Sequence, residues 1–158
     1  METSAALWYF REILERSTEV QAISETDQRL VQLLMGSKID SDILPKAENV
    51  LNFVDRVDKK IPGFRHQYER LSEFAHPNWS GTALLFSKRE DGGIANFGEN
   101  MRSEENALLL GLHNLTVALD VFQLSYDGVG ELMPEFVRLC EAKCEDERRR
   151  GHLIAVSS

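Results

Sequence analysis

The chain has 158 residues, of which 42% are hydrophobic and 28% charged, which is the size and composition of one globular domain with a single core. Its formal net charge of −8 at pH 7 keeps such a chain soluble and disfavours non-specific coating of nucleic acids, whose phosphates it repels. Two cysteines are too few for the disulfide framework of a secreted domain, so we expect reduced thiols.

The amino-terminal stretch has neither the pattern of a signal peptide nor that of a transmembrane span. No basic residue precedes its apolar residues, and charged side chains follow soon, at Arg11, Glu12, Glu15 and Arg16. We therefore expect a cytoplasmic protein that makes no contact with a membrane.

Three helices are predicted before residue 64. The first has one apolar face, formed by Leu7, Phe10 and Leu14. A second helix runs towards Gly36, and its apolar positions are Val20, Ile23, Leu30 and Leu34. Pro45 fits the first turn of a third helix, which ends at Pro62. The apolar stripe of this third helix is Val50, Val54, Val57 and Ile61.

The fourth helix is predicted over residues 64–76, and Pro77 ends it. Its buried stripe follows the spacing i, i+4, i+7, i+11 and consists of Phe64, Tyr68, Leu71 and Ala75. Beyond it, two short runs rich in strand-forming residues flank the turn signal "DGG". This pattern predicts a short β-hairpin, or else an extended insertion, around residues 82–98.

A fifth helix begins near Ser103, which suits an N-cap. Its apolar stripe, expected to join the shared core, is Leu108, Leu112, Leu115, Leu119 and Phe122. The segment "YDGVGELMP" is expected to break or kink this helix before a last amphipathic helix that ends near "EDERRRGH". The chain is thus predicted to be all-α, a single helical bundle of five or six helices over residues 1–158.

The polar face of the fourth helix carries the candidate site. At about 100° per residue, its charged and titratable side chains fall within a sector of roughly 120° opposite the apolar stripe. These side chains are His66, Glu69, Arg70, Glu73 and His76. One interpretation is a solvated face with ordinary one-turn neighbours, and the other is a site that these side chains form together.

Arg70 and His76 have the chemistry to cleave RNA as a pair. An arginine holds a phosphate and stabilises its developing charge, and a histidine transfers protons near neutral pH, so no metal is required. On an ideal helix the two side chains point about 120° apart. Distortion before Pro77, or a dimer whose cleft both pairs line, would have to bring them together. Glu73 or Asn78 would then orient the pair.

The spacing of Arg70 and His76 in "RLSEFAH", on a small helical chain, resembles the Arg, four to six residues, His motif of the HEPN superfamily. The match covers the fourth helix and its neighbours, with Leu71 where the family usually has a polar residue. The resemblance implies a bacterial helical protein, often a homodimer, that acts on RNA as a metal-independent endoribonuclease of a toxin or defence system. It implies an RNA substrate, a protein partner or antitoxin, and no cofactor.

The loop "HPNWSG" after the fourth helix borders this candidate site. Trp79 could stack a base of the substrate or close the end of the bundle, and Asn78 could bind the substrate or hydrogen-bond within a turn. His66 and Glu69 would complete the substrate-binding set.

Two other functions compete with RNA cleavage. Glu73 and His76 form a Glu-x-x-His element, with His66 and Glu69 one turn earlier, as in metal-binding bundles, although no second such element occurs. The remaining alternative is a non-enzymatic module whose acidic helical surface binds a protein partner or forms a dimer.

Overall fold

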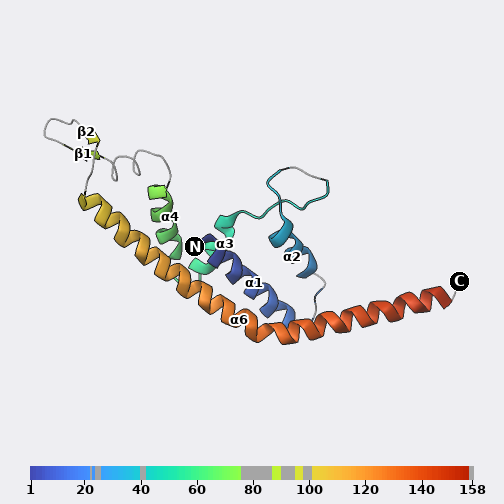
Figure 1. Ribbon diagram of the computed structural model, residues 1–158. Helices are drawn as coiled ribbons and strands as arrows, with labels where there is room; N and C mark the ends of the chain where they lie inside the picture. Colours follow the sequence, from blue (N-terminus) through green and yellow to red (C-terminus); the bar gives the residue numbers. More distant parts are fainter. Residues whose placement is uncertain are drawn as a thin grey trace.

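The computed structural model describes residues 1–21, 23, 26–39, 42–75, 87–89, 95–97 and 101–156. Within these ranges the chain forms five α-helices and one pair of short strands (Figure 1). The helices are α1 (Glu2–Glu19), α2 (Thr26–Met35), α3 (Val50–Asp58), α4 (Phe64–Ala75) and α6 (Met101–Val156). The predicted all-α class is therefore confirmed.

The two strands lie between α4 and α6. β1 (Ser87–Arg89) and β2 (Ala95–Phe97) pair in antiparallel register, with Lys88 opposite Asn96. This pairing agrees with the β-hairpin predicted around residues 82–98. Residues 90–94, which connect the strands, lie outside the described residues.

The core is built around α1, which packs against α2, α3 and α6. The ring of Tyr9 stacks on that of Phe53 of α3 with 5.0 Å between centroids, and the Arg56 guanidinium lies 4.6 Å from the Tyr9 ring centroid. The hydroxyls of Ser17 and Thr26, 2.6 Å apart, join α1 to α2. The buried apolar cluster consists of Ala5, Trp8, Tyr9, Ile13, Phe53, Val54, Val57, Phe64 and Val121.

The start of α3 differs from the prediction. The helix begins at Val50, because the Asn49 side chain caps it by accepting a hydrogen bond from the Leu51 backbone N–H at 3.1 Å. Pro45 was expected in the first turn, but it lies before the helix, where its carbonyl accepts a hydrogen bond from the Ser37 N–H at 2.9 Å. The segment before α3 is thus tied back to the end of α2 instead of being helical.

α6 is one continuous helix of 56 residues with Pro134 inside it. The predicted break at residues 126–134 is therefore wrong, while the ribbon does change direction in the orange part of α6, as a kink requires (Figure 1). A proline inside a helix removes one backbone hydrogen bond and its ring displaces the preceding turn, which bends a helix that other contacts hold in place. At 1.5 Å per residue, α6 is about 84 Å long, and its carboxyl-terminal part extends beyond the other helices.

α1 packs on a stripe of small side chains along α6. We name this stripe the α1-facing stripe, and it consists of Asn114, Ala118, Val121, Ser125 and Gly128. Ser4 Oγ donates a hydrogen bond to the Ala118 carbonyl at 2.8 Å. A Cβ at Gly128 would lie 2.5 Å from Arg11 Nε, so the glycine lets the Arg11 side chain cross α6 closely. Small side chains therefore set the short distance between the two helices.

A polar cluster holds the end of α1 against α6. Gln21 Nε2 donates to Glu135 Oε1 at 3.1 Å, and Arg138 Nη2 donates to Gln21 Oε1 at 3.0 Å. The Arg138 guanidinium also donates to the Glu135 carboxylate. The hydrogen bonds from Arg138 and then from Gln21 lower the pKa of Glu135 from 4.5 to about 2. The cluster therefore depends on an ionised carboxylate.

Backbone conformation predicts opposite effects for two glycine substitutions, one inside α6 and one before α4. Gly130 is inside the helix and a Cβ there would meet no atom within 4 Å, so Gly130→Ala should raise the free energy of unfolding by about 1 kcal/mol. Gly63 has a φ of 95°, so Gly63→Ala should lower it by about 1–2 kcal/mol. Thermal melts monitored by circular dichroism measure both. Loss of stability in Gly130→Ala would contradict a continuous helix.

The polar cluster predicts a stability change in acid. A carboxylate whose pKa is lowered by folding stabilises the fold above its unfolded value of about 4.5, and this contribution is lost as the pH falls through about 2. Between these pH values the melting temperature of the parent should fall more steeply than that of Glu135→Gln. Glu131→Gln, an exposed position one turn earlier, should follow the parent. Parallel pH profiles for all three proteins would show that the cluster does not contribute.

Candidate functional site

The polar face of α4 lies at the surface. This exposure is what the interpretation as a solvated face required. His66, Glu69, Arg70 and Glu73 are all exposed, while Phe64 on the opposite face is buried. The predicted division of this helix into an apolar and a polar face is therefore correct.

Arg65 forms ion pairs with Glu69 of this face and with Asp55 of α3. Arg65 Nε donates to Glu69 Oε1 at 2.7 Å, and Arg65 Nη1 donates to the Asp55 carboxylate of α3. These bonds, first from Glu69 and then from Asp55, raise the pKa of Arg65 further above its ordinary value. Arg65 thus links α4 to Asp55 of α3 and also pairs with Glu69 on its own helix, roles that the sequence analysis did not assign to either α4 residue.

Of the predicted catalytic pair, Arg70 lies within the described residues and His76 does not. Arg70 is exposed and forms no hydrogen bond or ion pair with any residue that the structure describes, and the same is true of His66. His76, Asn78 and Trp79 lie outside the described residues, so their distances to Arg70 and Glu73 stay predictions. The structure therefore places Arg70 where an anion could reach it, and its pairing with His76 stays a prediction.

The metal hypothesis gains nothing from the part of the chain that the structure describes. No group of three or more histidine, cysteine, aspartate or glutamate side chains there is arranged to hold a metal ion. Of the four side chains proposed as ligands, Glu69 already accepts a hydrogen bond from Arg65, and His76 is outside the described residues.

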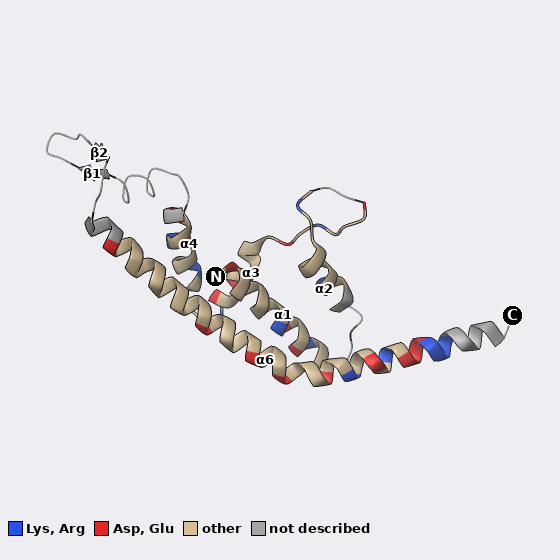
Figure 2. Ribbon diagram, viewed as in Figure 1, with Lys and Arg blue, Asp and Glu red and all other residues tan. Residues whose placement is uncertain are grey.

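The apolar stripe of the fifth predicted helix is exposed, which contradicts its expected place in the core. We call it the leucine stripe and add one aromatic residue that continues it, so that it consists of Leu108, Leu112, Leu115, Leu119, Phe122 and Tyr126. These side chains are between 38% and 63% exposed. In Figure 1 the shorter helices lie on one side of α6, and Figure 2 shows a long run of α6 beside α4 with few charged positions.

The physical reason for this error is that α6 carries two stripes with the same spacing. Each leucine-stripe residue from Leu115 to Tyr126 directly follows a residue of the α1-facing stripe, and the two stripes are about 100° apart on the helix. Hydrophobicity favoured the leucine stripe as the buried one. Small residues allow closer packing, so α1 occupies the other. The alternating spacing of 4 and 3 residues was the signal for a second apolar face on α6.

Length and composition would also allow α6 to cross a membrane. A segment within residues 105–150 is long and apolar enough for a span, and 22% of its most apolar window is buried by the rest of the protein. The cores of soluble proteins contain helices that meet the same criteria. The expectation of a protein without membrane contact therefore does not follow from α6 itself.

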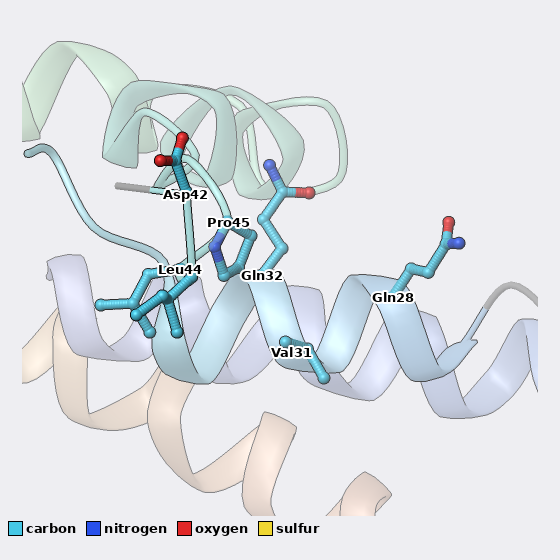
Figure 3. Close-up of a pocket in the computed structure, with 7 residues that line it drawn as sticks. Gln28, Val31, Gln32, Asp42, Leu44 and Pro45 are labelled. Atoms are coloured by element: carbon cyan, nitrogen blue, oxygen red, sulfur yellow. The ribbon is translucent and has the colours of Figure 1, made fainter. Parts of the chain in front are cut away.

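A groove lies beside α2. It has a volume of about 640 Å³ and is lined by Gln28, Val31, Gln32, Asp42, Ile43, Leu44 and Pro45 (Figure 3). The groove is open, and Ile43 at its rim is 90% exposed. Two amides and one carboxylate supply its polar atoms, and no histidine, cysteine or basic side chain lines it. This lining offers no nucleophile with an adjacent base.

Comparison with known proteins gives no relative for this chain. No protein-family model matches it, and neither a curated protein nor a solved structure does.

Proposed function

We propose that this chain is a helical protein-interaction module that binds a helix of a partner along the leucine stripe of α6. The observation that supports this is the exposure of all six stripe side chains. With a surface on the order of 200 Å² for each large side chain, they leave on the order of 600 Å² of apolar surface in water. Contiguous apolar patches of this size on a soluble domain mark interaction sites.

The spacing of the stripe favours a protein helix over lipid as the contact. Apolar residues that recur every 3.5 residues form a narrow seam that fits one facing helix, whereas a lipid-facing helix is apolar around most of its circumference. His113, Asp120 and Asp127 lie on the remaining face of α6, together with the exposed Leu124. The two carboxylates on this face are costly to bury in hydrocarbon and favour contact with water there.

The charges of α1 argue in the same direction. α1 lies along α6, and its Arg11–Glu15 ion pair, with 2.7 Å between charged atoms, lies beside the apolar part of α6. Glu12 of the same helix pairs with Arg56 of α3 at 3.2 Å. If α6 spanned a bilayer in this fold, these charged side chains would have to enter the hydrocarbon, which is costly.

Adjacent cysteine substitutions test whether a partner covers the stripe. In a Cys140→Ala, Cys144→Ser background, Leu119→Cys places a thiol on the stripe and Asp120→Cys places one on the polar face. In cells of the source organism, we expect maleimide to label Leu119→Cys at least about ten times more slowly, because labelling requires the complex to open.

Two outcomes would contradict this proposal. Equal labelling rates would mean that nothing covers the stripe. Protection that coincides with recovery of the protein in carbonate-washed membranes would mean that lipid covers it.

RNA cleavage is the second candidate, and the exposed Arg70 without an ion pair among the described residues favours it. Arginine in this state can bind a phosphate with both edges of its guanidinium. If the resemblance to the HEPN superfamily reflects activity, the purified chain should cleave cellular RNA in chelator and leave 2′,3′-cyclic phosphate ends. Arg70→Ala and His76→Ala should each lower the rate at least about a hundredfold.

The matched control for this assay is Arg16→Ala, which removes an exposed arginine on α1. It should retain the parent rate. A well-folded parent that leaves RNA intact would rule out the second candidate.

A further inference from the structure

We infer that the partner of the leucine stripe is a second copy of this chain, so that two α6 helices pair along their stripes around a two-fold axis. This inference rests on the proposed function and goes further by naming the occupant. The interface lies on α6 and does not require the polar face of α4. It is supported by the length of the seam, its position relative to α1, its flanking residues and its area.

The leucine stripe is the exposed part of a longer apolar seam along α6, which continues with the same spacing beyond the six exposed residues. After Tyr126 the same alternation of 3 and 4 residues reaches Val129, Met133, Phe136 and Cys140, which are half-buried. Ten consecutive seam positions are therefore apolar, and the next two are charged, at Lys143 and Glu147. A 3.5-residue repeat sustained over more than four heptads is the pattern of helices that pair by left-handed supercoiling.

The position of α1 leaves room for another helix. α1 covers the α1-facing stripe, and the leucine stripe is rotated from it by about 100°. A helix on the leucine stripe would lie beside α1 as a third member of a bundle, and none of the described helices occupies that place, since the stripe is exposed. The fold of one copy is thus complete without covering the seam.

The residues that flank the exposed seam fit an identical chain. They are Leu109, Thr116 and Gln123 on the side away from α1, whereas Ala118 and Ser125 on the other side are buried. In coiled coils such flanking positions select different partners through charges of opposite sign, and here Leu109, Thr116 and Gln123 are all uncharged. The acidic residues Asp120, Asp127 and Glu131 lie on the far side of α6, so the net charge of −8 does not set like charges against each other in the seam.

The exposed area is close to what a homodimer needs. A stable interface buries roughly 800 Å² per partner, and the stripe supplies on the order of 600 Å² before its flanking residues are counted. Two-fold pairing covers the stripes of both copies in one contact, because the same surface serves as both halves. A single contact thus removes the exposed leucine stripes of both copies from water.

Sedimentation equilibrium of the purified full-length chain tests this inference. We expect a dimer at micromolar concentration, and Leu119→Glu should raise the dissociation constant at least about a hundredfold, because a charge in the seam must be desolvated. Leu34→Glu is the matched control, since Leu34 is 78% exposed on α2, away from the seam, and this variant should stay dimeric. Leu119→Ser should also weaken the dimer. A melting curve like that of the parent would then show that this variant has lost pairing and not its fold.

Each other result overturns the inference. These results are a monomeric parent, a dimer that Leu119→Glu leaves intact, and a monomer that floats with vesicles of phosphatidylethanolamine and phosphatidylglycerol. A monomeric parent together with a protected Leu119→Cys thiol in cells would mean that a different protein occupies the stripe. In that case the proposed function stands and the inference of a second copy fails, whereas an unprotected thiol contradicts both.

Discussion

The packing of α1 on the small residues of α6 determines how the rest of the protein is arranged. Ser4 bonds to the Ala118 carbonyl at one end, Arg11 crosses Gly128 in the middle, and Gln21 joins Glu135 at the other end. Because α1 also carries α3 on its other side through the stacked rings of Tyr9 and Phe53, this contact fixes which face of α6 belongs to the core. The leucine stripe is exposed as a consequence.

The sequence was sufficient for the helices and their ends where local chemistry decides the structure. The apolar spacing of α4, the end of α2 beside Gly36 and the strand pairing after α4 all follow from periodicity and turn residues. At Pro134 the expected break does not occur and the helix bends instead, where Gln21 of the α1 end bonds to Glu135 directly after the proline. Local signals also failed at Asn49, whose cap starts α3 later than Pro45 suggested.

The burial of α6 could not be read from the sequence for a different reason. Two stripes with the same period compete for α1, and hydropathy ranks the leucines above Asn114 and Ser125. Ser125 Oγ donates to the Val121 carbonyl and Asn114 Nδ2 to the Leu110 carbonyl, which reduces the cost of burying these groups, while the buried Asn114 Oδ1 accepts no hydrogen bond. On α4, periodicity placed Arg70 on the polar face, but it gives no information on Arg65, whose ion pairs involve a second helix.

The one-residue offset between the two stripes of α6 makes the helix sensitive to changes in its length. Loss of a single residue between Ala118 and Val121 would turn everything downstream by one position around the axis. Phe122 and Tyr126 would then take the places of Val121 and Ser125 and push two aromatic rings into the closest part of the α1 contact. We therefore expect that descendants of this sequence accept many substitutions on the outer face of α6 but no insertion or deletion in the part that α1 covers.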